Sequence, residues 1–519
     1  MNILLGVVSV GLSLLFIFLC KSLIDRAVNG SNSGELIPAL QIAGVIIVQQ
    51  ICNFFRGRIE NSSSAAMMNT LRERLFYRVM LSRWSGRERF HTGDVTTRLE
   101  GDVRKVCDSL CVTFPTMVIT TIEFAFSFLF MLTMDSRLAW LLFAIMPITL
   151  LLSKRYMIRM RELTHSIREV DSSVQAHIQE HIQQRGVINS MGSILGSFDS
   201  FRSLSGELFN KNMRRVNYTL YSRLMVRLGF ATGYMVAFLW GVDGISRGII
   251  SFGVMTAFLQ LVSKVQAPIV EISSYISTIA QTATSIDRLG ELDALEIEEQ
   301  GEPHIVSGAV GVRFRGVSFN YGDRDILSDF GCDFRANDLH VVVGETGSGK
   351  STLLRLMLGF LTPLKGDVEI YNSDCCVKCS PLTRSNFVYV PQGNTLSSGT
   401  IRDNILLGDV DATDEDIALV LHTAAADFVC RLPNGLDTIC GERGAGLSEG
   451  EAQRIAIARG LLRKGDVLLL DEPTSALDSV TEELLIERLM KYAHNRTMIM
   501  VTHREITNNK CISIINLSR

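Results

Sequence analysis

The sequence predicts an all-α transmembrane domain followed by an α/β domain. With 47% hydrophobic residues, 20% charged residues and a mean hydropathy of +0.23, the chain is too apolar for a disordered protein and is typical of a protein that enters a membrane. Its apolar stretches lie mainly in the first half, whereas short β-rich runs alternate with helical segments in the second half. A net charge of -3 argues against a dedicated nucleic-acid binder. The 519 residues correspond to two to four domains at about 150 residues each.

Six apolar segments are predicted to cross the membrane as helices. Residues 3–20 and 36–55 contain no charged residue, and each has about the 20 residues needed to span a bilayer. A cleaved signal peptide is the alternative for residues 3–20, but no basic region precedes this stretch. The other four predicted spans are interrupted by single ionisable residues such as Glu123, Arg227 and Asp243, and they cover residues 109–134, 138–158, 225–245 and 248–270.

Arginine and lysine predict the orientation of these spans, since cytoplasmic flanks collect positive charge. Residues 56–105 carry eleven Arg and Lys, and residues 154–227 are similarly rich, whereas the connections 134–138 and 243–247 carry one Arg each. We therefore expect a cytoplasmic amino terminus, two long helical excursions into the cytoplasm, and a cytoplasmic carboxy-terminal half. The expected location is the inner (plasma) membrane of a bacterium.

A linker is predicted at residues 286–304, because this segment is acidic and polar. The transmembrane domain then covers residues 1–285, and the second domain covers residues 305–519. In the second domain, helical material separates β-rich runs at residues 312–319, 340–345, 387–392, 467–472, 498–503 and 511–517. This order indicates a largely parallel sheet that helices cover on both faces.

The segment Gly344–Ser351, GETGSGKS, matches the complete phosphate-loop pattern. It follows a predicted strand and precedes a helical run, which is the context that the motif requires. Glycines let backbone amides face nucleotide phosphates, Lys350 supplies a positive charge, and the Ser351 hydroxyl can reach Mg2+. The second domain is therefore predicted to be an α/β P-loop NTPase that binds a nucleotide together with Mg2+. The candidate nucleotide contacts in this segment and directly after it are Gly344, Thr346, Gly347, Ser348, Gly349, Lys350, Ser351 and Thr352.

Two carboxylates, Asp471 and Glu472, follow the apolar run 467–470 at the end of a predicted strand. Ligand sites in open α/β sheets lie at the carboxyl ends of strands. Asp471 is the candidate metal ligand, and Glu472 is the candidate that polarises the attacking water, because phosphoryl transfer needs alignment and charge compensation. A solvent-exposed acidic strand end is the alternative, and the phosphate loop upstream favours the catalytic interpretation.

Further motifs in the second domain point to a family. LSEGE at Leu447–Glu451 is followed by AQRIAIARGLL and later by LLLDEPTSALD. Together with the phosphate loop, these motifs resemble those of ATP-binding cassette (ABC) transporters, and nearly the whole chain is similar to exporter-type half-transporters, in which six spans precede one ABC ATPase domain. The family signature is usually LSGGQ, so Glu449 and Glu451 depart from it, whereas Ser448 and Gly450 are retained.

The resemblance also implies roles for single residues. Tyr321 matches the aromatic residue that stacks on adenine, Gln392 matches the glutamine that links magnesium to the membrane domain, and His503 matches the switch histidine near the γ-phosphate. Ser448 and Gly450 match the residues that meet the γ-phosphate of the opposite subunit. The catalytic candidates are thus Glu472, His503 and Lys350, and the metal candidates are Ser351, Gln392 and Asp471.

The implied activity is the export of a substrate across a membrane, driven by ATP hydrolysis in a dimer of half-transporters. The expected partners are a second half-transporter, with a homodimer favoured over a heterodimer, and membrane lipid, but no nucleic acid. One alternative is one half of a heterodimeric exporter with unequal ATP sites, and another is a membrane ATPase that regulates a partner without carrying cargo. Lipids, amphiphilic drugs and peptides stay open as cargo. Glu123, inside a predicted span, is expected to face the central cavity or a neighbouring helix.

Overall fold

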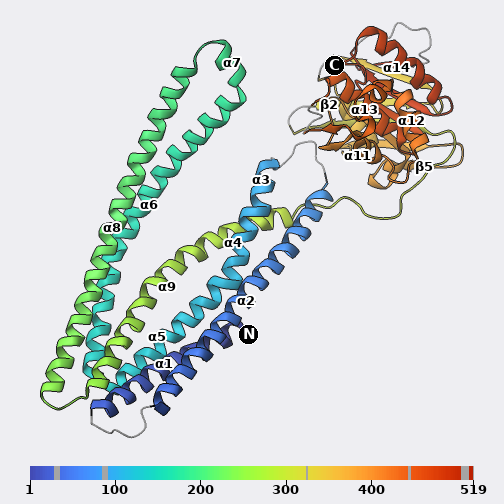
Figure 1. Ribbon diagram of the computed structural model, residues 1–519. Coiled ribbons are helices and arrows are strands. Elements are labelled where there is room, and N and C mark those ends of the chain that lie inside the picture. The colour runs from blue at the N-terminus through green and yellow to red at the C-terminus, as the bar shows by residue number, and fades with distance from the viewer. Residues whose placement is uncertain are drawn as a thin grey trace. The chain divides into compact units, whose positions relative to one another are not determined.

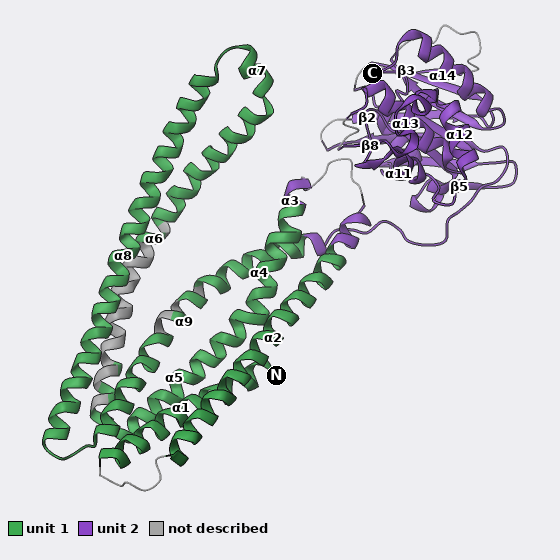
Figure 2. Ribbon diagram, in the orientation of Figure 1, with its two compact units in different colours: residues 1–75, 96–291 green, residues 76–95, 292–519 purple. Residues whose placement is uncertain are grey.

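A computed structural model describes residues 1–28, 36–83, 90, 92–322, 325–345, 347–441, 446–503 and 513–517, without the side chains of residues 138, 141–142, 144–158, 161, 269–270, 273 and 276. The chain divides into two compact units (Figure 2). Unit 1 comprises residues 1–75 and 96–291, and unit 2 comprises residues 76–95 and 292–519.

Unit 1 is all helical, as predicted (Figure 1). The long apolar segments of the first half suit helices, because a backbone in lipid must satisfy its hydrogen bonds internally. Helices α6 and α8 run side by side, joined by the short α7. The helices, with two π-helical stretches η1 and η2, are α1 (Asn2–Val28), α2 (Leu36–Met80), α3 (Thr92–Thr97), η1 (Arg98–Asp102), α4 (Val103–Asp108), η2 (Ser109–Thr113), α5 (Phe114–Met134), α6 (Ser136–Gln183), α7 (Arg185–Ser190), α8 (Ile194–Ser246) and α9 (Phe252–Asp293).

Four helical segments among the described residues are long and apolar enough to cross a membrane. They are Asn2–Val28, Leu36–Met80, Thr92–Met134 and Ile194–Ser246. The predicted spans 138–158 and 248–270 fall largely in α6 and α9, where some side chains lie outside the described residues. The count of six spans therefore stays a prediction.

Buried apolar side chains of unit 1 gather where the helices α1, α5, α6, α8 and α9 meet. The cluster includes Ile17, Met131, Ala139, Ala237 and Phe258, each at most 1% exposed. The expected cytoplasmic excursions continue the spans without a break, since α2, α6 and α8 have 45, 48 and 53 residues.

Unit 2 contains a five-stranded parallel sheet with the strand order β11-β3-β10-β9-β6. These strands confirm the predicted runs at 340–345, 387–392, 467–472, 498–503 and 511–517. Alternate residues of β9 point to opposite faces: Leu468 and Leu470 pack in one buried cluster, and Val467 and Leu469 pack in another. The strands of unit 2 are β1 (Gly311–Asn320), β2 (Asp325–Phe334), β3 (Leu339–Gly344), β4 (Lys365–Tyr371), β5 (Cys376–Lys378), β6 (Phe387–Val390), β7 (Gly399–Thr400), β8 (Ile439–Cys440), β9 (Val467–Asp471), β10 (Thr497–Thr502) and β11 (Ser513–Leu517).

The run predicted at residues 312–319 does not join the parallel sheet. It forms β1 in a separate antiparallel sheet with the order β2-β1-β4-β5. The physical reason is the short connection between β1 and β2, because only antiparallel neighbours can be joined without a long crossover. The expectation of one largely parallel sheet was wrong for this strand.

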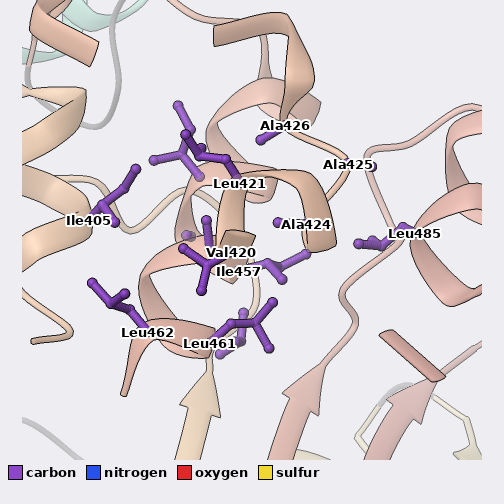
Figure 3. Packing of buried hydrophobic residues seen from close by; sticks show 14 of the residues in the cluster. Ile405, Val420, Leu421, Ala424, Ala425, Ala426, Ile457, Leu461, Leu462 and Leu485 are labelled. Carbon is purple, nitrogen blue, oxygen red and sulfur yellow. The ribbon is translucent and has the colours of Figure 1, made fainter. Parts of the chain in front are cut away.

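The helices of unit 2 pack on the parallel sheet and on one another (Figure 3). Ile405 of α11, Val420 of α12 and Ile457 of α13 are at most 3% exposed and belong to one cluster. The helices are α10 (Lys350–Met357), α11 (Ile401–Leu406), α12 (Asp414–Thr423), α13 (Glu449–Leu462) and α14 (Ser479–Tyr492), with 3-10 turns η3 (Pro381–Asn386), η4 (Asp427–Arg431) and η5 (Gly435–Asp437).

The predicted linker 286–304 begins as a helix, because α9 continues to Asp293. Beyond it, Ile297 pairs with Ser82 in an antiparallel bridge, the Arg83 amide donates to the Glu296 carbonyl at 2.7 Å, and the Glu298 amide donates to the Leu81 carbonyl at 2.9 Å. The end of α2 and the linker are thus joined by backbone hydrogen bonds inside unit 2.

Candidate functional site

The phosphate-loop segment connects β3 to α10 through backbone conformations that glycine favours. Gly347 and Gly349 have φ values of 83° and 99°, a region that side chains with a Cβ rarely adopt. A Cβ at Gly344 would lie 2.6 Å from the Ser348 Oγ and 2.7 Å from the Leu517 carbonyl. The loop is therefore a close-packed cradle that only glycine allows. Thr346 lies outside the described residues.

Lys350 is the first residue of α10 and is 6% exposed. Its Nζ donates to the carbonyls of Gly344 at 2.7 Å and Glu345 at 2.9 Å, and lies 3.4 Å from the His503 Nδ1. Burial lowers the pKa of Lys350, while the negative charges of Glu472 and Asp471 act in the opposite direction. Its ammonium thus sits in the loop, held by backbone groups that it could exchange for phosphate oxygens.

Two buried polar atoms beside this ammonium have no hydrogen-bond partner among the described residues: the Ser348 Oγ and the Asp471 Oδ1. Such orphaned groups are rare and point to a missing ligand or water. Burial raises the pKa of the Asp471 carboxyl, and a hydrogen bond from Ser351 opposes this shift. Hydroxyl and carboxylate oxygens form the hard donor set that Mg2+ prefers, so Ser351 and Asp471 fit this cation. Thr352, in the same turn of α10, is buried.

Glu472, directly after β9, is held by two side chains from other strands of the sheet. The Gln392 Nε2 donates to its Oε2 at 2.5 Å, and the His503 Nε2 lies 2.5 Å from its Oε1. Gln392 follows β6 and His503 follows β10, and both strands flank β9, so the register of the parallel sheet brings the three side chains to one edge. Together with Lys350 they form a continuous polar cluster.

The backbone of Glu472 is strained, with a φ of 51°. Four hydrogen bonds hold it: its amide donates to the Val501 carbonyl at 3.0 Å, and its carbonyl accepts from the Gln453 Nε2 at 2.8 Å, the Ser475 Oγ at 3.2 Å and the Ser475 amide at 3.3 Å. Gln453 is 2% exposed, and the sequence analysis missed it. The available signal was a glutamine next to the apolar positions Ala452, Ile455 and Ala456 of the same helix, which are buried with it.

Tyr321 follows β1 and is half-buried. Its ring packs edge-on against Phe319 with a centroid distance of 4.9 Å, and the Arg355 Nη1 lies 3.5 Å from its hydroxyl. These two neighbours belong to β1 and α10, not to the phosphate loop. Its role toward adenine stays a prediction.

The signature residues form the amino-terminal cap of α13 rather than part of the Lys350 cluster. The Ser448 amide donates to the Glu451 Oε2 at 2.8 Å, and the Glu451 amide donates to the Ser448 Oγ at 3.2 Å. This reciprocal pair is a capping box, which accepts either Glu or Gln at the third position of the helix. A Cβ at Gly450 would lie 2.8 Å from the Ala476 carbonyl, so this glycine permits close packing on the loop Ser475–Asp478. Residues 442–445, which directly precede Gly446 and the signature, lie outside the described residues.

Glu123 of α5 contacts a neighbouring helix, one of its two expected surroundings. Its Oε1 lies 2.7 Å from the Nζ of Lys264 of α9.

Comparison with known proteins supports the interpretation of both units. The family model described as ABC transporter matches residues 327–475, and the one described as ABC transporter transmembrane region matches residues 1–269. YgaD of Bacillus subtilis, provisionally named a multidrug export ATP-binding/permease protein, is 27% identical over 97% of this chain and 89% of its own length. The ATP-dependent permease MDL1 of Candida albicans is 27% identical over 95% of this chain and 74% of its own length.

A solved structure of a bacterial Atm1-family ABC exporter with ATP bound has the same fold. It superposes with a TM-score of 0.81 at 24% sequence identity, covering 100% of this chain and 92% of that one. The predicted order, a helical transmembrane domain followed by an α/β ABC ATPase domain, is confirmed. The chain belongs to the ABC transporters as an exporter-type half-transporter, an integral membrane ATPase coupled to transport.

Proposed function

We propose that two copies of this chain form a homodimeric exporter that binds ATP with Mg2+ between Lys350 of one subunit and Ser448 of the other. The observation that carries the proposal is the polar cluster of Lys350, Gln392, Glu472 and His503, which three strands and the phosphate loop hold at the carboxyl edge of the sheet. This cluster offers a positive charge, a carboxylate and hydrogen-bond donors where a terminal phosphate is to be cleaved.

Each residue of the cluster has a distinct role in the proposed reaction. The Lys350 ammonium binds the β- and γ-phosphates, and the amides of Gly347 and Gly349 line the loop. Glu472 polarises the attacking water and accepts its proton, and His503 orients the Glu472 carboxylate and hydrogen-bonds to the γ-phosphate. Tyr321 stacks on the adenine.

Ser351 and Asp471 would hold Mg2+, with Gln392 beside them. The cation neutralises charge that develops on the phosphate oxygens when it is bound. Because Gln392 and Glu472 share a hydrogen bond, a movement of Gln392 alters the position of the Glu472 carboxylate.

The capping box supports the proposal that this signature can complete an ATP site. In a homodimer, the two ATP sites would then be equal. The Glu451 carboxylate accepts a hydrogen bond from the Ser448 amide of its own helix end, which is the contact that a glutamine would make. The substitution therefore keeps the local structure of the usual signature. Glu449 is exposed at the first helical position, where a negative charge also complements the helix dipole.

ATP drives transport by binding the closed dimer more tightly than the open one, since only a differential affinity can shift such an equilibrium. Closure would turn the substrate cavity outward, and hydrolysis through Glu472 would reset it. The site lies in the cytoplasm and the helices in a bacterial inner membrane, in keeping with the basic flanks of the spans.

Steady-state ATPase measurements on the purified chain with no partner protein test this proposal. Wild-type protein should hydrolyse ATP with magnesium, and Glu472→Gln should bind ATP but lose steady turnover. A chain that is inactive alone, but active with a second, different half-transporter, would replace the homodimer by the heterodimer. Hydrolysis that no cargo stimulates in proteoliposomes would instead favour a regulatory ATPase.

A further inference from the structure

Polar side chains join α5 and α9 around the end of the predicted span 248–270, which contains Lys264, whereas Glu271 and Tyr275 directly follow it. The Lys264 Nζ lies 2.7 Å from the Glu123 Oε1, and the Glu271 Oε2 accepts from the Thr120 Oγ1 at 3.3 Å and from the Tyr275 hydroxyl at 3.4 Å. We call these five residues the polar seam. Lys264 and Glu271 are seven residues apart and Thr120 and Glu123 three apart, so each pair shares one face of its helix.

Glu123 lies at a depth where polar groups are expensive. Glu123 is eleven residues from Met134, the end of α5, which corresponds to about 16 Å at a rise of 1.5 Å per residue. The hydrocarbon core of a bilayer is about 30 Å thick, so Glu123 lies near its middle if Met134 marks one surface. Ionisable residues at such depths usually line a substrate path or pair with one another.

The charges of the seam do not balance. Lys264 compensates Glu123, whereas the contacts of Glu271 among the described residues come from the neutral hydroxyls of Thr120 and Tyr275. With both carboxylates ionised, the seam carries one excess negative charge. Glu271 is also exposed, so a ligand can reach its carboxylate.

Two further polar groups near the seam are neutral, and each has an oxygen that can accept a hydrogen bond. Pro268 has no amide to donate to the Lys264 carbonyl four residues earlier, so the ordinary helical hydrogen bond is missing there. One turn beyond Glu123, the Ser127 hydroxyl is fully buried and has no hydrogen-bond partner among the described residues.

Aromatic rings on α5 and α6 continue from the seam toward Met134, the end of α5. Phe124 lies one turn from Thr120 and stacks with Phe128 at a centroid distance of 6.4 Å. Phe128 in turn contacts Trp140 at 5.7 Å and Phe143 at 5.2 Å. Aromatic faces beside an anionic group attract cations and bind apolar surface as well. An anionic or a neutral ligand would gain only the second of these interactions.

We propose that the polar seam binds hydrophobic monocations, with Glu271 as their counter-charge and the aromatic rings of α5 as their apolar contact. This inference rests on the proposed export function, and it names the substrate class as amphiphiles with one positive charge. Protonated or quaternary amines with bulky apolar groups belong to this class.

Binding to the purified full-length chain in the absence of nucleotide tests the proposal. Tetraphenylphosphonium and tetraphenylborate have nearly the same shape and opposite charges, so the pair separates charge recognition from apolar partition. Equilibrium dialysis should show selective binding of radiolabelled tetraphenylphosphonium to wild-type protein. Equal binding of both ions, or preference for the borate, would overturn the proposal.

Single substitutions test whether Glu271 provides the negative charge that the bound cation meets. Glu271→Gln should weaken tetraphenylphosphonium binding about tenfold, the factor expected for one modest charge interaction, and Glu271→Asp should retain most of it. Lys264→Gln removes the positive charge of the seam and should strengthen binding, which a merely structural role would not do. Glu207→Gln, which loses an ion pair to Lys211 in α8, is the matched control and should bind as wild type does.

Two outcomes would contradict the site: unchanged affinity in Glu271→Gln with a wild-type unfolding midpoint, or weaker binding in Lys264→Gln. If Glu271→Gln does not fold, two measurements still test the proposal. They are tetraphenylphosphonium binding to Lys264→Gln and the comparison of tetraphenylphosphonium with tetraphenylborate on wild-type protein. Because the assay contains no ATP, it is independent of the export proposal. Selective cation binding without ATP-driven uptake would support the seam and contradict export, whereas uptake of other cargo without cation selectivity would contradict the seam alone.

Discussion

Arg384 and Glu298 fasten the linker to the ATPase domain, and breaking this contact should loosen unit 2. The Arg384 Nη1 and Nη2 donate to the two carboxylate oxygens of Glu298 at 2.9 Å and 3.0 Å. The Arg384 Nε donates to the Leu358 carbonyl at 3.0 Å, and its guanidinium lies 4.2 Å from the centroid of the Phe360 ring. Arg384 is thus fixed on three sides, and Glu298 is docked to it bidentately.

The coupling energy between Arg384 and Glu298 can be worked out from their hydrogen-bond geometry and their exposure to solvent. The side chains of Arg384 and Glu298 are 24% and 14% exposed, so the pair is more shielded than an ordinary surface ion pair, which contributes about 0 to 1 kcal/mol. A hydrogen bond to a charged group contributes about 1.5 to 3 kcal/mol net, and partial solvent screening reduces the sum of two. We expect a coupling energy of about 2 kcal/mol, which corresponds to a fall of about 4 to 8 °C in the unfolding midpoint of a domain of this size.

A double-mutant cycle measures this coupling in the full-length chain. Glu298→Ala, Arg384→Ala and the double variant are compared by the calorimetric unfolding midpoint of the ATPase domain and by the amount of cargo transported per ATP hydrolysed. Lys491→Ala is the control, because it breaks an exposed ion pair to Glu487 in the same unit and should shift the midpoint by little.

The linker continues α9 and pairs with the end of α2, so a loosened Glu298 should also lower the transport yield per ATP. If the effects of Glu298→Ala and Arg384→Ala simply add, the two residues are not coupled and the reasoning is wrong. A control variant that loses as much stability as Glu298→Ala would refute it equally.

The remaining predictions concern the ATP site. Lys350→Ala should abolish ATP-dependent transport and weaken nucleotide binding in a filter assay, because no backbone amide replaces its charge; wild-type turnover would contradict the phosphate-loop assignment. Glu472→Gln should slow turnover by about 100-fold or more while ATP binding persists, since an amide accepts no proton; rapid turnover would exclude its role. Replacing Glu449 by Gly and Glu451 by Gln together should leave the ATP concentration for half-maximal turnover nearly unchanged, whereas Glu451→Ala should destabilise the helix cap by about 1 kcal/mol. A large fall in that concentration would mean that the carboxylates repel the nucleotide. Because burial raises the pKa of the Asp471 carboxyl, activity at limiting Mg2+ should fall on acidification at a pH above the ordinary aspartate pKa of about 3.9, and excess Mg2+ should move the midpoint lower; a pH profile that does not respond to Mg2+ would contradict the assignment.

Local sequence signals were enough to predict the parallel strands and the phosphate loop. Val467–Leu470 is an uninterrupted apolar run that is followed by Asp471. The phosphate loop requires glycine at positions 347 and 349, where the backbone is in the left-handed region. Pairing between distant segments left no such signal. The sequence did not show that Ile297 of the linker meets Ser82, because a single isolated bridge has no periodicity.

Gln453 was missed for a related reason. Its function depends on the carbonyl of Glu472, a backbone group that no side-chain pattern reveals. In the sequence, Glu451 was only a departure from the usual signature, whereas the structure shows a hydrogen bond that depends on the helix starting at Glu449. Sequence patterns predicted the candidate residues Lys350, Gln392, Glu472 and His503, and tertiary contacts bring these side chains together and hold them.

Simultaneous measurement of ATP hydrolysis and cargo accumulation in proteoliposomes tests the central claim, that hydrolysis at Glu472 drives export. Liposomes containing only this chain are supplied with external ATP and Mg2+ and with labelled tetraphenylphosphonium, a fluorescent lipid or a labelled peptide. We predict that at least one cargo accumulates in step with hydrolysis in wild-type protein and that neither process continues in Glu472→Gln. Sustained hydrolysis with no accumulation of any cargo, or accumulation that persists in Glu472→Gln, would contradict the account.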